Sequence, residues 1–209
     1  MGGQVSRYRG TIPSVPLFDK LAAGLALARM ELSRRRIDTK APWEGKRAAT
    51  WDALSLEAWA EAHVGSAKAK SLLGMGAEMI LTAHPRDISY LYWLHYCQSG
   101  GGFTRLSEVR DGAQQDRFVE GAQALSLGLA RPLGERVRLG FPVREIDGAD
   151  DGVWVRGEAG QVRARRAIMA LAPAMMKSIV VRPGLPTARE ALQREMPMGS
   201  IVKVVLFYE

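Results

Sequence analysis

The stretch GGGFTRLSEVRDGAQQDRFVEGAQALSLGLA, from Gly100 to Ala130, divides the 209-residue chain into two halves with different patterns. Before it, apolar residues recur at helical spacing, and after it, short β-rich runs are separated by turn residues. Its glycines and amides are typical of a loop that connects two folded segments. We therefore expect an α+β protein with a mostly helical first half, followed by a β-meander and a buried strand.

Helices are predicted throughout the first half. The first, residues 17–36, has a basic face opposite an apolar stripe made of Leu17, Leu21, Leu25, Ala28 and Leu32. Ser55 and Ser66 are good N-caps for the next two helices, and Pro85 is expected to end the second of these.

A further helix is expected over the run ISYLYWLHYC, with Asp87 as its N-cap. Helical spacing places Tyr90, Trp93 and Cys97 near one face of this helix. Such an aromatic stripe fits two interpretations, because it forms either part of the core or one wall of an apolar cavity.

The second half is interpreted as a meander. The runs RVRLG, PVREID, GVWVRG and QVRARRAIMAL are expected strands, with GADDG and GEAG as hairpin connections. The segment AIMAL, residues 167–171, loses the alternation of the other runs, so we expect a strand buried on both faces. A short helix over residues 185–194 precedes a last strand, GSIVKVVLFY. Because the chain stops at Glu209, directly after that strand, we expect it to be truncated.

Composition excludes several classes of protein. A single cysteine, Cys97, excludes an internal disulfide framework and cysteine-based zinc sites, and it fits a cytoplasmic location. The net charge of +7 is typical of nucleic-acid binders, but the basic residues are scattered and form no recognition pattern. We therefore expect no nucleic-acid partner. No transmembrane segment is expected either, because Pro173 interrupts the longest apolar run, residues 167–176.

The common nucleotide and metal motifs are not recognised in this sequence. Gly74-Met75-Gly76 has Met79 where a dinucleotide fingerprint needs its third glycine, and it lies in a predicted helix. The three histidines, His63, His84 and His95, lack ligand spacing, so they are interpreted as surface or core residues and no metal site is expected.

Two polar features have open interpretations. Lys203 is flanked by apolar residues in SIVKVVLF; it faces water if this strand is half-exposed, and it becomes a candidate functional residue if the strand is covered. Gln114 and Gln115 are either turn residues or amides that orient a polar group in a pocket, since an amide both donates and accepts hydrogen bonds.

Taken together, ordered segments of the chain resemble the flavin-dependent monoamine oxidase family. They are APWEGKRAATWDALSLEAWAE, ISYLYWLHYCQSGGGFTRL, DGAQQDRFVEGAQALSLGLARPLGERVRLGFPVREID, ARRAIMALAPAMMKSIVVRPGLP and MPMGSIVKVVLFYE. The resemblance implies the two-domain fold of amine oxidase flavoproteins. It places residues 1–119 in a substrate-binding domain and residues 120–192 in an FAD-binding segment, with residues 193–209 as a return strand of the substrate domain.

The resemblance also implies roles for particular residues. Lys203 matches a lysine that holds a water against the flavin, and Val143 matches a valine whose backbone contacts the adenine end of FAD. The implied substrate-binding residues are Met79, Ile80, Leu106, Ser107 and Gln114, of which Gln114 orients the amine and Leu106 and Ser107 form a gate. The chain departs from the family pattern at Glu120-Gly121 and Ala172-Pro173-Ala174, and Ser107 is smaller and more polar than some gate residues.

The implied reaction is FAD-dependent oxidation of a primary or secondary amine to an imine, which hydrolyses to an aldehyde or ketone. Hydride passes to the flavin, and oxygen reoxidises it to give hydrogen peroxide. The family's glycine-rich pyrophosphate loop and its flavin-covering segment are not recognised here, so we expect a central fragment that is inactive in isolation. A homodimer of the complete enzyme is left open.

Other functions stay open at this point. A related flavoprotein, such as a desaturase, would act on a non-amine substrate through a bulky apolar cavity. A non-catalytic fragment or interaction module would agree with the missing nucleotide loop.

Overall fold

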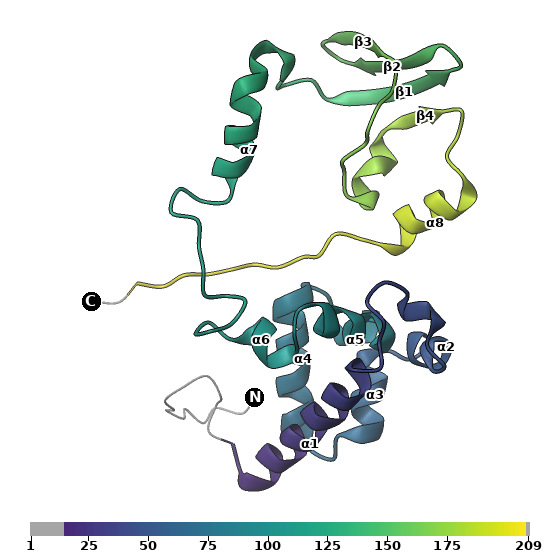
Figure 1. Ribbon diagram of the computed structural model, residues 1–209. Helices are drawn as coiled ribbons and strands as arrows, with labels where there is room; N and C mark the ends of the chain where they lie inside the picture. Colours follow the sequence, from purple (N-terminus) through teal and green to yellow (C-terminus); the bar gives the residue numbers. More distant parts are fainter. Residues whose placement is uncertain (1–14, 208–209) are drawn as a thin grey trace. The chain divides into compact units, whose positions relative to one another are not determined.

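A computed structural model describes residues 15–207 of the chain (Figure 1). The chain forms two compact units, of which one comprises residues 15–117 and 200–207 and the other residues 118–199. The first unit is helical and the second contains the sheet. The expected α+β class is confirmed. The first fourteen residues of the expected substrate domain lie outside the described residues.

The helical unit is built from short and medium helices joined by tight connections (Figure 1). In chain order these are α1 (Leu17–Arg34), η1 (Pro42–Glu44), α2 (Ala48–Asp52), α3 (Leu56–His63), α4 (Ala67–Leu81), η2 (Pro85–Asp87), α5 (Tyr90–Ser99) and α6 (Phe103–Ser107). Helix α5 contacts α1, α2 and α3, and α4 contacts α1, α3 and α6. The expected helices are therefore present, with η1 and α2 in the connector after α1 and with η2 between α4 and α5.

Side-chain caps determine where several helices start. The Ser55 hydroxyl accepts the Ala58 N–H at 3.1 Å, and the Ser66 hydroxyl accepts the Ala69 N–H at 3.1 Å, as the sequence predicts. The prediction for α5 is wrong, because Ser89 caps it by accepting the Tyr92 N–H at 3.2 Å. Asp87 is instead part of η2, the turn that begins at Pro85.

The end of α4 also differs from the sequence prediction. The helix stops at Leu81 rather than at Pro85, because Thr82 adopts a left-handed conformation with φ 53°. A left-handed residue directly after a helix ends the repeating hydrogen bonds, so the proline is not needed for termination.

The core of the helical unit centres on one face of α5. Tyr90, Trp93 and Cys97 are buried, and the Tyr90 ring stacks on Trp59 with 4.8 Å between ring centroids. The core interpretation of the aromatic stripe is thus confirmed for these residues. Burial also raises the pKa of the Cys97 thiol to about 12, because the thiolate would lose its hydration.

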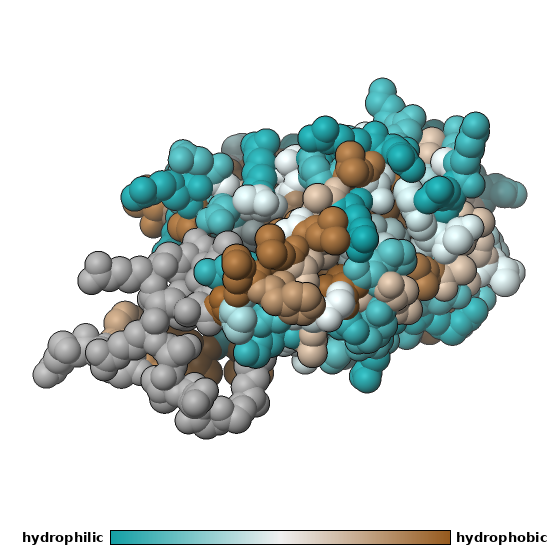
Figure 2. Space-filling view, turned by 90° about the horizontal axis from the view of Figure 1, so that it is seen from below, coloured by the Kyte–Doolittle hydropathy of each residue, from teal (hydrophilic) through white to brown (hydrophobic). Residues whose placement is uncertain are grey.

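The apolar stripe of α1 is not its packing face. Leu17, Leu21, Leu25 and Leu32 are exposed, and apolar side chains gather on the surface seen in Figure 2. The packed face carries Asp19, Ala26 and Met30 instead. Buried Asp19 is satisfied because the Ser66 hydroxyl donates to it at 2.5 Å, which ties the start of α4 to α1.

The second unit contains a mixed four-stranded sheet (Figure 1). Its elements are α7 (Gln123–Ala130), η3 (Arg131–Arg136), β1 (Val143–Ala149), β2 (Gly152–Gly157), β3 (Gly160–Ala164), η4 (Pro173–Ser178), β4 (Val180–Arg182) and α8 (Thr187–Glu195). The strand order is β3-β2-β1-β4, with antiparallel β1-β2 and β2-β3 pairs. The predicted antiparallel pairing of PVREID with GVWVRG, and of GVWVRG with the run that starts at Gln161, is confirmed, as is the helix near residues 185–194. The parallel partner β4 was not predicted.

Charged side chains fix the register on one face of this sheet. Arg156 Nη1 on β2 donates to Glu145 Oε1 and to Asp147 Oδ2 on β1, each at 3.0 Å. Arg182 on β4 also donates to Glu145. Because strand side chains alternate, a slip of one residue would break these pairs and turn the valines of β2 to the wrong face.

Three predicted strands are wrong within the described residues. Residues 137–140, 167–171 and 200–207 contain no strand, and Ile168, expected to be buried on both faces, is 94% exposed. A strand is stable only when its backbone groups pair with a neighbour, and no described strand pairs with these segments. The last residue of the run GSIVKVVLFY lies outside the described residues.

The buried face of α5 predicts a large contrast between adjacent aromatic residues. Trp93→Ala should lower the free energy of unfolding by about 3–5 kcal/mol, because Trp93 is 0% exposed and its loss leaves a cavity. Tyr92→Ala, at an exposed position of the same helix, should cost less than about 1 kcal/mol. Urea denaturation followed by circular dichroism measures both, and equal losses would contradict the assigned core.

Candidate functional site

The residues with predicted functional roles fall into both units. Lys203 and the predicted substrate-binding residues belong to the helical unit, and Val143 belongs to the sheet unit.

Met79 lies on the surface of α4, beside the segment that leads to Lys203. Met79 is 77% exposed and lines an open pocket of about 370 Å³ together with Ser200 and Ile201. Ile80, the next residue, packs against the buried core instead. The structure thus places Met79 in one pocket with Ser200 and Ile201, while Lys203 does not line this pocket and Ile80 packs against the core.

A charged pair lies in the same pocket. Glu78 and His84 both line it, and His84 Nε2 is 3.6 Å from Glu78 Oε1. The remaining lining is mainly apolar, contributed by residues such as Met75, Met79 and Ala83. This pocket can therefore accept an apolar chain with a polar or cationic group at one side.

Helix α6 carries the predicted gate and packs closely against glycines. A Cβ added to Gly100 would lie 2.5 Å from Leu106 Cδ2, and one added to Gly76 would lie 2.6 Å from Phe103 Cζ. Leu106 and Phe103 also pack against the buried core. These positions need glycine because any side chain would occupy the space that holds α6.

Leu106 and Ser107 have different surroundings, although they are adjacent. Leu106 packs over Gly100, whereas Ser107 lines a second pocket of about 240 Å³ between α1, α4 and α6. The Ser107 hydroxyl donates to the carbonyls of Phe103 and Thr104, at 3.0 and 3.1 Å. The walls of this pocket include Leu27, Leu72 and Leu73, so Ser107 contributes a polar edge to an apolar pocket.

Gln114 is tied to α6 by its backbone and its side chain. Its N–H donates to the Glu108 carbonyl at 3.2 Å, and its Nε2 donates to the Leu106 carbonyl at 3.3 Å. Gln115 serves the turn, because its Oε1 accepts the N–H of left-handed Asp111 at 2.6 Å. The two glutamines thus have different roles: Gln115 stabilises the loop, and exposed Gln114 keeps its amide near α6.

Lys203 lies outside any helix or strand, and Val143 lies at the start of a strand. Lys203 is exposed in an unpaired segment and forms no ion pair with any described residue. Val143 begins β1 and pairs with Gly157 of β2, whereas the β1-β4 pairing begins only at Glu145. Val143 therefore extends beyond its β4 neighbour at one end of the sheet.

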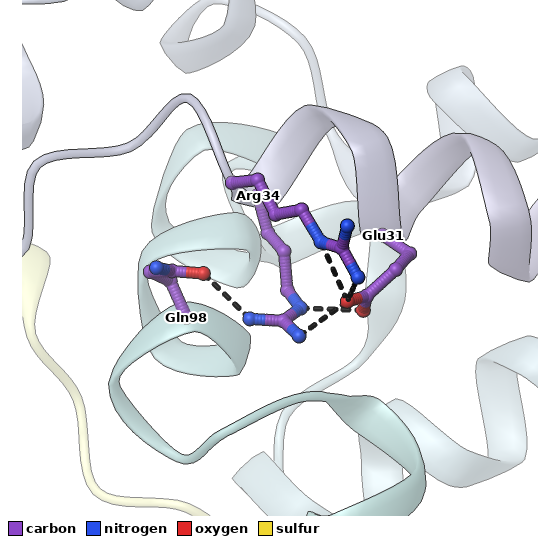
Figure 3. Close-up of polar contacts among 4 residues, drawn as sticks. Glu31, Arg34 and Gln98 are labelled. Atoms are coloured by element: carbon purple, nitrogen blue, oxygen red, sulfur yellow. Dashed lines mark hydrogen bonds and ion pairs between the residues drawn. The ribbon is translucent and has the colours of Figure 1, made fainter.

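A polar cluster that the sequence did not predict lies beside the turn formed by Gly100, Gly101 and Gly102, here called the glycine turn, which precedes α6 (Figure 3). Arg34 Nε donates to Glu31 Oε2 at 2.5 Å, and Arg34 Nη1 donates to Gln98 Oε1 at 2.6 Å. Arg34 Nη2 also pairs with Glu31, and this hydrogen bonding lowers the pKa of Glu31. A basic residue at the end of a helix is ordinary, so the sequence gives no signal that Arg34 reaches α5.

The histidines have structural partners. His63 Nδ1 is 2.8 Å from the Trp59 carbonyl, and His95 Nε2 is 3.1 Å from the Thr39 carbonyl. Within residues 15–207, no group of three or more His, Cys, Asp or Glu side chains is placed to hold a metal ion. None of the described helices is both long and apolar enough to cross a membrane.

Comparison with known proteins gives consistent matches across the chain. A family model described as flavin containing amine oxidoreductase matches residues 2–209. AofH of Mycobacterium tuberculosis, whose name describes a flavin-containing monoamine oxidase, is 33% identical over 206 residues, covering 99% of this chain and 45% of AofH. A flavin-containing amine oxidase of Danio rerio is 31% identical over 86% of this chain and 35% of its own length. The chain thus spans less than half the length of these relatives.

Solved structures of amine oxidases are also similar. Putrescine oxidase bound to putrescine matches with a TM-score of 0.82 and 25% identity, over 90% of this chain and 42% of that one. Cyclohexylamine oxidase from Brevibacterium oxydans matches with a TM-score of 0.79 and 27% identity, over 88% and 40% of the two chains. The fold described here is therefore found within longer oxidases.

The glycine packing of α6 predicts opposite effects of two Gly→Ala substitutions. Gly76→Ala should lower the free energy of unfolding by about 1–3 kcal/mol, because its methyl group would overlap the Phe103 ring. A Cβ added to Gly24 in α1 meets nothing within 4 Å. Gly24→Ala should therefore raise the free energy of unfolding by up to about 1 kcal/mol, because alanine has the higher helix propensity. Thermal melting compares them, and a stabilising Gly76→Ala would disprove the close packing.

The pKa of Glu31 predicts acid sensitivity of the polar cluster. Its folded pKa lies below the ordinary value of 4.5, so its stabilising contribution is present above pH 4.5 and is lost as the pH falls through the folded pKa. Melting temperatures of the wild type and Glu31→Gln should therefore differ at pH 7 and converge as the pH falls below the folded pKa of Glu31. A difference independent of pH would show that the ionised carboxylate is not responsible.

Proposed function

Because the chain belongs to the family of flavin-containing amine oxidoreductases, we propose that it forms the central part of an enzyme that oxidises primary or secondary amines. The match over residues 2–209 is the observation that carries this proposal. The pocket lined by Met79, Ser200 and Ile201 supports it, because it lies between α4 and the residues that precede Lys203. We assign the helical unit to substrate binding and the sheet unit to FAD binding.

The amine is proposed to bind along α4 and α6. Met79 would contact its apolar part directly, with Ile80 supporting the wall from behind. Gln114 would orient the amino group through its side-chain amide, and Leu106 and Ser107 would form the gate. An apolar lining favours the neutral amine over the ammonium ion, because burying an unpaired charge is costly.

We propose one flavin contact in each unit. Val143 extends past its β4 neighbour and would contact the adenine end of FAD, and Lys203 has no ion-pair partner among described residues, so its ammonium would hold a water near the flavin. When bound, FAD would accept a hydride from the α-carbon of the amine, and oxygen would then be reduced to hydrogen peroxide. The imine would be hydrolysed to an aldehyde or ketone.

The location of the protein is proposed from a separate observation. We propose a cytoplasmic location on the basis of the single buried cysteine. Homodimer formation of the complete enzyme stays a prediction.

Flavin retention and amine oxidation test this proposal. Residues 1–209 alone should lose FAD on desalting, because they contain no Gly-x-Gly-x-x-Gly loop. A chimera in which residues 1–209 replace the matched segment of putrescine oxidase should retain FAD, and a primary amine should bleach its visible absorbance without oxygen. Lys203→Met in the chimera should slow hydrogen peroxide formation at least about 10-fold, or about 1.4 kcal/mol.

Each outcome separates the alternatives. Retained flavin that no primary or secondary amine bleaches would favour a flavoprotein with a non-amine substrate. Retained flavin in residues 1–209 alone would show that they are not a silent fragment. A folded Lys203→Met chimera with unchanged peroxide formation would remove Lys203 from the site.

A further inference from the structure

We propose that Arg34 is a positioning residue that fixes the glycine turn before α6 and thereby holds Leu106, Ser107 and Gln114. The assignment of these residues to the substrate rests on the proposed function, whereas the positioning itself follows from the contacts of Arg34. Three features support it: the anchoring of Arg34, its contact with the turn, and the hydrogen bonds from the turn to Gln114.

Arg34 is anchored more firmly than the arginine next to it. Its guanidinium pairs with Glu31 through two nitrogens and with Gln98 through the third, and its side chain is 15% exposed. Arg35 also approaches Glu31, at 3.2 Å, but its side chain is 66% exposed. A planar guanidinium held on three nitrogens is fixed in orientation, whereas an exposed ion pair contributes little.

This fixed guanidinium lies against the glycine turn. A Cβ added to Gly102 would be 3.3 Å from Arg34 Nη2, and Gly101 and Gly102 have φ angles of 82° and 117°. The Gly102 N–H donates to the Cys97 carbonyl at 2.8 Å, and the Gly102 carbonyl accepts the Leu106 N–H at 3.1 Å. Gly102 therefore connects the end of α5 to the first turn of α6.

Arg34 is the side chain that closes this side of the turn. An open pocket of about 390 Å³ lies here, lined by Arg34, Gly101 and Gly102 and by apolar residues such as Leu27 and Met30. The three atoms nearest to a Cβ built on Gly102 all belong to the Arg34 guanidinium, at 3.3–3.6 Å. The contacts that fix this guanidinium (Figure 3) therefore also restrain Gly102 on this side.

Hydrogen bonds link the position of Gln114 to that of α6. The Arg105 carbonyl accepts the Ala113 N–H at 2.8 Å, and the Leu106 carbonyl accepts Gln114 Nε2 at 3.3 Å. The Glu108 carbonyl accepts the Gln114 N–H at 3.2 Å. Because Gln114 is exposed and these partners all lie on or directly after α6, a shift of α6 moves the Gln114 amide with it.

Hydrogen exchange with matched variants tests the proposal on the chain as it exists. Arg34→Met keeps an unbranched stem but removes the donors, and Arg35→Met makes the same change at the exposed neighbour. Ser66→Ala removes the α4 cap and the Asp19 contact, so it supplies a general loss of stability that does not touch the turn. Mass spectrometry would compare amide exchange in residues 100–114 with exchange in α3 and α4.

The expected result is local. Arg34→Met should speed exchange in residues 100–114 at least about 10-fold more than in α3 and α4, whereas Arg35→Met should leave it within about 2-fold of the wild type. Ser66→Ala should speed exchange without this preference for residues 100–114. Arg34→Lys should restore only part of the protection, because one ammonium cannot reproduce the guanidinium fork that Glu31 and Gln98 hold.

Kinetics of the flavin-loaded putrescine oxidase chimera supply the second arm. Arg34→Met should lower kcat for amine oxidation about 10-fold with an unchanged flavin spectrum, because a misplaced Gln114 orients the amine poorly. Unchanged exchange in residues 100–114, or faster exchange with unchanged kcat, would overturn the proposal. If the flavin-loaded chimera with Arg34 intact oxidises no amine, the proposed function fails, and the exchange comparison still decides whether Arg34 positions the turn.

Discussion

Burial of one face of α5 is the constraint on which the helical unit depends. Tyr90, Trp93 and Cys97 are held in the core, and α1, α2 and α3 contact this helix around them. Once α5 is fixed, its last turn fixes the start of the glycine segment, because the Cys97 carbonyl accepts the Gly102 N–H. The core of the unit and the placement of the candidate gate are therefore parts of one arrangement, and apolar burial supplies the largest favourable contribution to it.

Polar contacts set the relative orientation of packed elements, which apolar burial alone does not determine. Hydrophobic packing is non-directional, so it brings α1 and α5 together without setting the orientation of the turn that follows α5. The Arg34 guanidinium has fixed geometry and reaches both Glu31 and Gln98. The Arg156 contacts play the same part in the sheet unit, where they join β1 to β2 on the charged face. In both units, arginine determines alignment and apolar side chains determine association.

The sequence predicts features that depend on neighbouring residues better than features that depend on distant ones. Ser55 and Ser66 are recognised as caps because a cap needs only the next three residues, and the β1-β2-β3 meander follows from turn residues between alternating runs. The failures are non-local. Residues 137–140, 167–171 and 200–207 have strand composition, yet a strand also needs a partner, which composition does not specify. Arg34 was missed for the same reason, since Gln98 is 64 positions away.

The buried thiol of Cys97 has a practical consequence. It is the only cysteine of the sequence, it lies within the core, and burial raises its pKa to about 12, so it carries almost no reactive thiolate at neutral pH. A cysteine introduced at an exposed position would therefore be the sole site of labelling in the folded chain. The protein is thus suited, without removal of its native cysteine, to spin labels or fluorophores attached one at a time.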